Sequence, residues 1–263
     1  MDNTSLTLVG SGIKFVSHIT VETRAYIEQS DKVLYLVNEP AMKEWLKKQN
    51  KHAESLDDLY QKFPLRLHCY RAITEYILET VRKGGHICVV LYGHPSVFAQ
   101  PGLEAVIQAK AEGIDARILP AISAEDCLFA DLLIDPGRFG CQSFEATDFL
   151  IHHRTWDPTS HLILWQVGVI GVTGRAPDDY DNSKAAQVLV DYLLAHYPKT
   201  HEVILYEASQ YPHFDPKIIK VALQDLATAD YSRISTLYVP PAAKAKCDQA
   251  MLQSLGIDLN ECK

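Results

Sequence analysis

Two tyrosines and an arginine whose side chains could move a proton lie close together in the first third of the chain, at Tyr60, Arg66 and Tyr70. Arg66 and Tyr70 are four residues apart, which places them on one face of a helix that Pro64 helps to begin. Tyr60 is expected in the loop just before that helix. A phenol near a guanidinium can have its pKa drawn below ~10, so this pair could take a proton from a weak acid. A second tyrosine could hydrogen-bond a developing oxyanion, although the helical pattern alone would assign Tyr70 to the core.

Two turns that contain glycine follow predicted strands. Gly10-Ser11-Gly12 resembles the start of a dinucleotide-binding turn, but Phe15 stands where the third glycine would be, and a tight strand-to-helix turn explains it equally well. We expect backbone rather than a side chain to face whatever lies above that strand end. Tyr92-Gly93-His94-Pro95 follows an apolar strand, where open α/β sheets bind ligands, although an ordinary turn could have the same residues.

Two further segments carry polar groups at positions that could meet a ligand. Ser123-Ala124-Glu125-Asp126 has the S-x-x-D form of a helix cap, and a helix N-terminus also offers N–H groups to an acceptor. Gln166 interrupts the apolar run LILWQVGV. A buried amide must be hydrogen-bonded, either to neighbouring backbone, which we slightly favour from the sequence alone, or to a polar ligand.

The elements that position these residues follow a strand–helix alternation in the first half of the chain. Alternation at this spacing predicts a parallel sheet covered by helices. The clearest helix, Leu65–Arg82, has apolar residues at three- and four-residue steps, and the continuously apolar run His86–Leu91 predicts a strand covered on both faces. The remaining strands are expected at Ser5–Val9, Lys32–Val37 and Ala116–Leu119, and the remaining helices at Val21–Glu28 and Leu103–Ala111.

The second half has a different character, with strands more widely spaced. A helix at Ala124–Leu133 is followed by strands at His161–Val169, Glu202–Tyr206 and Ser235–Val239, and by a helix at Ser183–Tyr197. The Gly-, Pro- and Asp-rich segment Gly171–Asp181 predicts a mobile surface loop. We place a domain boundary near Pro120, which divides the chain into domains 1–119 and 120–263 and leaves a short helical tail at the end.

Composition limits the class of protein. The chain has 263 residues, 47% hydrophobic and 22% charged, an ordinary globular balance. The net charge is −8, whereas a general nucleic-acid binder needs a basic surface to bind phosphates. We expect no signal peptide and no membrane segment, since Leu162–Val172 is too short to span. Six cysteines without a CxxC pair predict free thiols in a cytoplasmic chain, and no spacing suggests a metal site.

Together these segments resemble a known family. The stretches SLTLVGSGI, YGHPSVF, PAISAEDCLFADLLIDP, FEATD, LWQVG and ISTLYVPP are similar to the tetrapyrrole methylase superfamily, the class III S-adenosylmethionine-dependent methyltransferases. The SAEDCLxADLxIDP and YxxxxxRxxxY segments resemble, more narrowly, the borosin peptide-backbone α-N-methyltransferases. The resemblance runs from about residue 5 to about residue 256. It implies two α/β domains, with a mostly parallel sheet in the N-terminal domain and a mixed sheet in the C-terminal domain.

The resemblance also implies a methyl donor and its contacts. S-adenosylmethionine would bind in the cleft between the domains and leave as S-adenosylhomocysteine. The residues implied to line its site, together with the turn at Gly10, are Gly93, His94, Val97, Ser123, Ala124, Gln166, Ala208 and Thr236. Matched by spacing, the tyrosine–arginine–tyrosine set that promotes methylation of a backbone amide in borosins is Tyr60, Arg66 and Tyr70. We expect one tyrosine to act as base or proton relay, and Arg66 to lower the phenol pKa and carry charge in the transition state.

Fused members of that family carry their substrate peptide at the C-terminus, behind a helical clasp. The segment LGIDLNECK resembles neither a clasp nor an apolar core peptide. We therefore expect a split system, in which a separate precursor protein is methylated in trans. The family further implies a homodimer, which would form a heterotetramer with two precursors.

Three alternatives remain open at this stage. A tetrapyrrole C-methyltransferase of the precorrin or uroporphyrinogen type would keep the superfamily but needs no amide deprotonation, so it leaves the two tyrosines and Arg66 unexplained. A ribosomal RNA methylase is disfavoured by the acidic charge. A catalytically inactive module that binds the donor or a peptide is a different class, and consumption of the donor in the presence of precursor would separate it from an enzyme.

Overall fold

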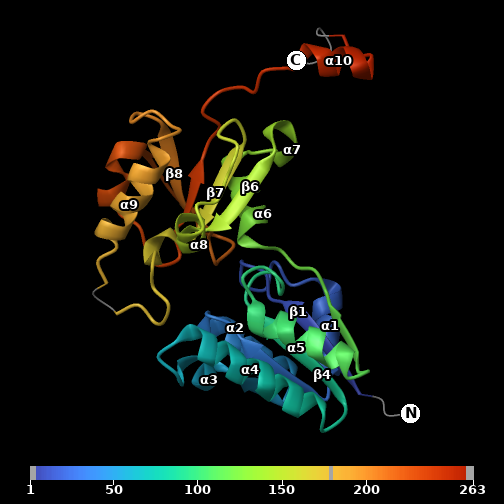
Figure 1. Ribbon diagram of the computed structural model, residues 1–263. Helices are drawn as coiled ribbons and strands as arrows, with labels where there is room; N and C mark the ends of the chain where they lie inside the picture. Colours follow the sequence, from blue (N-terminus) through green and yellow to red (C-terminus); the bar gives the residue numbers. More distant parts are fainter. Residues whose placement is uncertain (1–3, 178–179, 259–263) are drawn as a thin grey trace. The chain divides into compact units, whose positions relative to one another are not determined.

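The computed structural model describes residues 4–177 and 180–258 and divides the chain into two compact units (Figure 1). The first unit takes the chain up to Ile134 together with Gly171–Tyr180 and Tyr206–Ile218. The second takes Asp135–Ile170, Asp181–Leu205 and the chain from Ile219 onward. The units exchange segments along the sequence, and the single domain boundary near Pro120 stays a prediction.

The first unit is built on a five-stranded parallel sheet, as the alternation predicts. Its strands lie in the order β3-β2-β4-β1-β5, and each neighbouring pair is parallel. Strand β4 spans His86–Leu91, the same bounds as the apolar run in the sequence. The other strands are β1 (Ser5–Gly10), β2 (Lys32–Leu36), β3 (Ala53–Ser55) and β5 (Asp115–Ile118).

Helices cover both faces of this sheet, which explains why β4 has no polar face. Ile87 and Val89 point into a core with α4 (Arg66–Val81) and α5 (Gln100–Ala111), whereas Cys88 and Val90 point into a second core with α1 (Val21–Gln29) and α2 (Pro40–Gln49). Successive side chains of a strand face opposite sides, so a strand between two helical layers must be apolar throughout. The short helix α3 (Asp57–Gln61) precedes α4, and α6 (Ala124–Leu132) follows β5.

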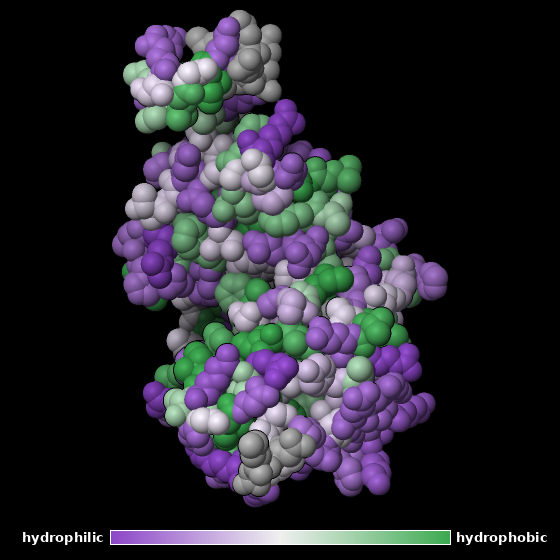
Figure 2. Space-filling model, turned by 90° about the vertical axis from the view of Figure 1, so that its right-hand side faces the viewer, coloured by the Kyte–Doolittle hydropathy of each residue, from purple (hydrophilic) through white to green (hydrophobic). Residues whose placement is uncertain are grey.

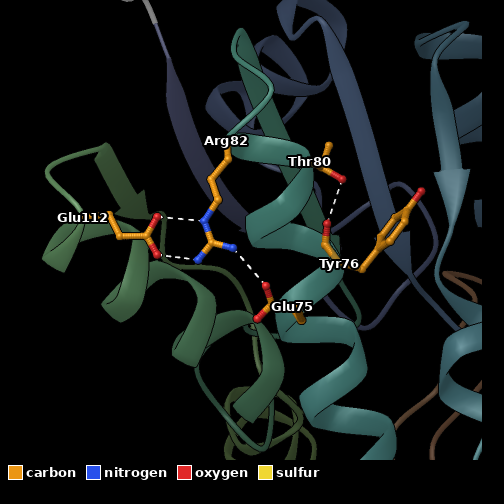
Figure 3. A network of polar contacts seen from close by, with 5 residues as sticks. All are labelled: Glu75, Tyr76, Thr80, Arg82 and Glu112. Carbon is orange, nitrogen blue, oxygen red and sulfur yellow. Dashed lines mark hydrogen bonds and ion pairs between the residues drawn. The ribbon is translucent and has the colours of Figure 1, made fainter.

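The two helices on one face are tied together at their C-terminal ends (Figure 3). Arg82, directly after α4, donates Nε to Glu112 Oε2 at 2.9 Å and Nη2 to Glu112 Oε1 at 2.6 Å, and Nη1 to Glu75 Oε1 at 2.9 Å. Thr80 Oγ1 donates to the backbone oxygen of Tyr76. The ion pairs are largely exposed and therefore worth little individually, but the two-pronged geometry fixes the direction of Arg82.

The second unit is built on a mixed sheet, also as expected. The strand order is β6-β7-β10-β8-β9, with β6 and β7 parallel and β7 and β10 antiparallel. Its strands are β6 (Cys141–Glu145), β7 (His161–Trp165), β8 (Glu202–Glu207), β9 (Lys217–Ala222) and β10 (Thr236–Val239). The helical segments are α7 (Pro136–Phe139), α8 (Ala146–Ile151), α9 (Ser183–Leu193), α10 (Gln249–Leu255) and the 3-10 turns at Val167–Val169 and Leu223–Thr228.

Some elements differ from the sequence-based expectation. Strand β7 ends at Trp165 rather than Val169, because Gln166 has a φ of 59° and its left-handed backbone stops the strand. Tyr60 lies on α3 and not in a loop, so that expectation is wrong. The strands β3, β6 and β9 and the helix α2 were not predicted. Their segments are short or lack a clear period.

The surface has no single large hydrophobic area on the face drawn in Figure 2. On the face drawn in Figure 2, hydrophobic residues form separate patches among hydrophilic ones. Among the residues that the structure describes, no helix combines the length and apolar character needed to cross a membrane.

The described cysteines Cys69, Cys88, Cys127, Cys141 and Cys247 are free thiols, and Cys262 lies outside the described residues.

Candidate active site

The structure brings together the two tyrosines that the spacing singles out. The rings of Tyr60 on α3 and Tyr70 on α4 have centroids 6.2 Å apart and planes inclined by 32°. Their side chains share a hydrogen bond. Tyr60 is 41% exposed, whereas Tyr70 is half-buried between α3 and the body of α4. One phenol of the pair therefore faces solvent and the other is shielded from it.

The pKa of Tyr70 differs from the sequence-based expectation in its direction. Burial, assisted by the charge of Tyr60 and the hydrogen bond with it, raises the pKa of Tyr70 to about 12. Arg66, one helical turn earlier on α4, lowers the pKa of this phenol, but its effect is smaller than that of burial. The proximity to Arg66 is thus confirmed, whereas the net lowering of the phenol pKa expected from it is wrong.

Arg66 is held by a segment far away in the sequence. Its Nη2 donates to the backbone oxygen of Gly174 at 3.2 Å, and its backbone N donates to Thr173 O at 3.2 Å. Leu65 and Gly174 form an antiparallel bridge. Residues 171–177 belong to the first unit, so this part of the loop that we expected to be mobile is paired to the N-terminus of α4.

Helix α3, which carries Tyr60, is also anchored to its surroundings. Lys43 on α2 donates Nζ to Asp57 Oδ2 at 2.5 Å, at the first residue of α3. The backbone N of Leu56 donates to Tyr35 O in strand β2. These two contacts fix the start of the helix beside the sheet, and they place Tyr60 one turn later.

A groove of ≈ 320 Å³ between α4 and α5 reaches the outer side of Tyr70. The hydrogen bond from Thr74 Oγ1 to Pro101 O joins the two helices there. The groove is lined mainly by polar side chains: Leu67, Tyr70, Arg71, Thr74, Glu75, Gln100, Glu104 and Gln108.

The glycine turns at the ends of β1 and β4 lie against each other. The backbone N of Gly12 donates to Gly93 O and the backbone N of Gly93 donates to Gly12 O, at 3.2 and 3.1 Å. A Cβ on Gly10 would lie 2.1 Å from Gly93 O and 2.6 Å from Ala121 Cβ, so Gly10 is required for the close approach of the protein's own backbone. A Cβ on Gly93 would meet Ile13 Cδ1, at 3.4 Å, so its surroundings are more open than those of Gly10.

The other first-unit residues of the implied donor site lie in turns and at a helix start. His94 accepts from the backbone N of Ser96 through Nδ1 at 3.2 Å, and Val97 is 38% exposed. Ser123 and Asp126 form the predicted capping box of α6: Ser123 N donates to Asp126 Oδ2 at 2.7 Å, and Asp126 N donates to Ser123 Oγ at 3.2 Å. Ala124 begins α6, and Ala208 follows β8.

Gln166 and Thr236 lie together in the second unit. Leu237, next to Thr236, pairs with Leu164, two residues before Gln166, so both positions lie at the same end of the antiparallel pair of β7 and β10. Thr236 is buried and Gln166 is half-buried. The left-handed backbone of Gln166 is a conformation that side chains rarely adopt, which marks this turn as locally constrained.

Sequence reasoning overlooked a polar pair formed by a tyrosine after position 200 and an aspartate of α6. The hydroxyl of Tyr206 donates to Asp131 Oδ2 at 2.6 Å, and the ring of Tyr206 is 1% exposed. Burial, together with the hydrogen bond to Asp131, raises the pKa of Tyr206. No local pattern could have indicated this contact, because the two residues are 75 positions apart.

The arrangement suits proton transfer and the stabilisation of negative charge on oxygen. A shielded phenol of high pKa is a strong base once deprotonated, the exposed Tyr60 connects it to solvent, and a fixed guanidinium can stabilise negative charge on oxygen. Within residues 4–177 and 180–258, no three His, Cys, Asp or Glu side chains gather as metal ligands would.

Comparisons with curated proteins identify relatives over nearly the whole chain. The chain is 40% identical over 257 residues to the methyltransferase/ribosomally synthesized cyclic peptide omphalotin A precursor of Omphalotus olearius, which covers 96% of this chain and 61% of that protein. It is 44% identical over 241 residues to the corresponding gymnopeptides precursor of Gymnopus fusipes, covering 90% and 57%. The chain thus spans about 60% of the length of the curated relatives that it matches.

The solved structures and the family model agree with this relationship. The fold is similar to a uroporphyrin-III-C-methyltransferase from Thermus thermophilus, with a TM-score of 0.64 and 19% identity over 94% of this chain and 99% of that one. It is also similar to a diphthine synthase, with a TM-score of 0.63 and 16% identity over 92% of each chain. The model of the tetrapyrrole (corrin/porphyrin) methylases matches residues 5–227. The chain therefore belongs to the tetrapyrrole methylase family.

Proposed function

We propose that this protein transfers methyl groups from S-adenosylmethionine to backbone amide nitrogens of a ribosomally made peptide. The observation that carries the proposal is the set of Tyr60, Arg66 and Tyr70, with two phenols in hydrogen-bond contact and the guanidinium one turn away. Methylation of an electron-rich carbon has no need of such a base. The relatives that are named as methyltransferase/cyclic peptide precursors support a peptide substrate.

The chemistry of a peptide amide explains why both types of side chain are needed. Its N–H is a weaker acid than a phenol, and its nitrogen lone pair is delocalised into the carbonyl. As phenolate, Tyr70 accepts the amide proton on its own oxygen, and Tyr60 passes a proton between Tyr70 and solvent. Arg66 stabilises the negative charge that moves onto the amide oxygen. The freed nitrogen pair then forms the N–C bond to the methyl carbon.

S-adenosylmethionine, when bound, supplies an electrophilic methyl group whose bond to sulfur breaks with the electron pair leaving on sulfur. The turn at Gly93, which is less crowded than that at Gly10, the half-buried His94 and the exposed Val97 fit a ligand beyond the end of β4. Gly10 shapes this region by letting the two turns pack. We propose Ser123, Ala124, Ala208, Gln166 and Thr236 as further contacts of the donor.

Two parts of the proposal concern assembly. The family resemblance suggests that the protein works as a homodimer in the cytoplasm. We also propose that the precursor is a separate protein, which gives a heterotetramer when two precursors are bound. Co-expression with candidate precursors tests this part of the proposal. Methylation in trans changes the mass of the partner and leaves the mass of this chain unaltered.

The test is intact-mass spectrometry of each small protein encoded beside this gene, co-expressed with the full chain. Stepwise gains of single methyl groups, localised by fragmentation to backbone nitrogens, would establish the reaction and the partner. Tyr70→Phe serves as the inactive control, and it should leave the partner mass unchanged.

The contrary outcome is equally definite. If no co-expressed protein gains mass while the purified chain binds S-adenosylmethionine in calorimetry, the backbone methylation proposal fails. Incubation of the same protein and donor with uroporphyrinogen III then tests the tetrapyrrole alternative. Failure of that reaction as well would leave an inactive binding module.

A further inference from the structure

The N-terminus of α4 is joined to the segment around Gly174 by a backbone pairing and by a side-chain hydrogen bond. Arg66 Nη2 donates to Gly174 O, Arg66 N donates to Thr173 O, and Leu65 bridges Gly174. The hydrogen bond from Arg66 N belongs to the backbone bridge of Leu65 and Gly174. The hydrogen bond from Nη2 holds the guanidinium of Arg66. The segment therefore contacts both the backbone at the start of α4 and the side chain of Arg66.

Only a glycine can occupy position 174 in this arrangement. A Cβ there would lie 2.3 Å from the backbone oxygen of Pro64 and 3.4 Å from its carbonyl carbon. The obstructing atoms are backbone, so no side-chain rotation can relieve the clash. Any larger residue must push the segment away from α4, and Gly174 O then moves away from the guanidinium.

Asn182 binds the backbone of the residues that precede the segment 171–177. Asn182, which is 6% exposed, donates Nδ2 to Val167 O at 2.7 Å and accepts from the backbone N of Ile170 through Oδ1 at 3.1 Å.

We propose that Gly174 is a positioning residue, whose backbone oxygen holds the guanidinium of Arg66 in the orientation that the methyl transfer requires. This inference rests on the proposed function for its catalytic consequence, but not for the contact itself. A guanidinium has its five N–H donors in one plane, so a hydrogen bond from Nη2 to Gly174 O restricts the orientation of the whole group. The segment thus pre-organises the positively charged guanidinium, which would otherwise adopt several orientations on the flexible side chain of Arg66.

Selective modification of arginine tests the contact without any turnover. In the unaltered full chain, phenylglyoxal should modify Arg66 more slowly than Arg71, an exposed arginine of the same helix, as followed by peptide mass mapping. In Gly174→Ala, the rate at Arg66 should rise roughly tenfold or more, the scale for losing a hydrogen bond to a charged group, while the rate at Arg71 stays the same. Equal rates at the two arginines in the unaltered protein, or an unchanged rate at Arg66 in Gly174→Ala, would overturn the proposal.

Gly171→Ala is the matched control. It adds the same methyl group three residues earlier, where a Cβ meets nothing within 4 Å, and its φ of 79° makes it a strained position. This variant therefore shows how backbone strain in the segment, without the clash at Pro64, changes the rate at which phenylglyoxal modifies Arg66. The rate at Arg66 should change less than twofold in this variant. A tenfold rise here too would assign the effect to general loosening of the segment and overturn the proposal.

A kinetic cycle tests the role in the reaction, using the precursor that gains mass in co-expression. Gly174→Ala should lower kcat roughly ten- to a hundredfold with little change in the affinity for S-adenosylhomocysteine. In an Arg66→Lys background, which lacks the planar guanidinium, Gly174→Ala should lower kcat less than twofold. Equal losses in the two backgrounds would show that Gly174 does not act through Arg66. If no precursor is methylated at all, the proposed function fails, and the phenylglyoxal rates still decide the contact.

The pH profile of kcat tests whether the substitution at Gly174 acts through the pKa of Tyr70. The titratable or charged groups around Tyr70 are Tyr60 from α3, Arg66, Cys69, Arg71 and Glu75 from α4, and Glu104 from α5. Displacing Arg66 removes from this set the contribution that lowers the pKa of Tyr70. Below the pKa of Tyr70, a further rise of that pKa lowers the ionised fraction by the same factor at every pH. The kcat of Gly174→Ala should therefore lie below that of the unaltered protein by a constant ratio from pH ~7 to ~9.5, with the same slope near one. A slope that differs from that of the unaltered protein would show that the substitution does not act through the pKa of Tyr70.

Discussion

The rings of Tyr60 and Tyr70 lie 6.2 Å apart between centroids and share a hydrogen bond, although α3 carries one of them and α4 the other. Their environments differ. Tyr60 is 41% exposed, and burial raises the pKa of Tyr70 to about 12. We propose that this pair carries the amide proton to solvent, with Tyr70 as the base and the more exposed Tyr60 as the relay.

The first prediction concerns the division between catalysis and donor binding. Tyr60→Phe and Arg66→Ala should each lower kcat for the co-expressed precursor roughly 100- to 1000-fold, because they remove a proton relay and a charge that matter in the transition state. Both variants should bind S-adenosylhomocysteine with nearly unchanged affinity in calorimetry. Tyr76→Phe, on α4, and Arg117→Ala, on β5, are the matched controls. Unchanged methylation rates in both site variants would remove these residues from the mechanism.

The pH dependence of turnover follows from the raised pKa of Tyr70. With a pKa of about 12, only a small fraction of the phenol is ionised at neutral pH, and this fraction grows tenfold per pH unit. We therefore expect log kcat to rise with a slope near one from pH ~7 to ~9.5, as measured with rapid-quench assays. Tyr70→Phe should have no such rise. A plateau across this range in the unaltered protein would contradict the assignment of Tyr70 as the base.

Acid sensitivity of the second unit should depend on His161. Burial lowers the pKa of this histidine, and its Nδ1 lies 2.7 Å from the hydroxyl of Tyr238. Below the unfolded-state pKa of 6.5, the unfolded chain binds a proton that the folded chain resists, so the free energy of unfolding must fall as the pH decreases. The loss is at most about 1.4 kcal/mol per pH unit for one histidine.

Urea unfolding at several pH values measures this effect. His161→Gln removes the titrating group and should flatten the loss of stability below pH 6.5. His18, whose pKa burial also lowers, remains in the variant, so part of the slope should persist. An identical slope in His161→Gln and the unaltered protein would show that His161 does not titrate differently in the folded state.

The pair of Tyr206 and Asp131 should stabilise the first unit. Tyr206→Phe leaves the Asp131 carboxylate without its buried donor and should lower the free energy of unfolding by about 1–3 kcal/mol. Asp131→Asn should cost less, because the amide oxygen can still accept from the hydroxyl. Since the pKa of Tyr206 is raised on folding, its contribution is present below the unfolded pKa of 10 and is lost as pH rises toward the folded value. Chemical unfolding measures both variants, and a larger loss in Asp131→Asn than in Tyr206→Phe would contradict this account.

The parts of the site that depend on local interactions could be predicted from the sequence. The strand His86–Leu91 has the predicted bounds because an apolar run of this length suits a strand between two helical layers. The capping box of Ser123 and Asp126 follows from residues three positions apart. The turn of α4 between Arg66 and Tyr70 follows likewise from helical spacing.

Only the tertiary structure decided the remaining features, because they depend on contacts between distant segments or on burial. Gly174 reaches Arg66 across 108 positions, and no local pattern distinguishes it from other loop glycines. The direction of the Tyr70 pKa reverses the expectation from Arg66, because the desolvation of a phenolate is set by the packing around the helix and not by the spacing of charges along it. The sequence by itself determined which side chains could perform the chemistry, and the packing of α3, α4 and the segment 171–177 determined how they are held.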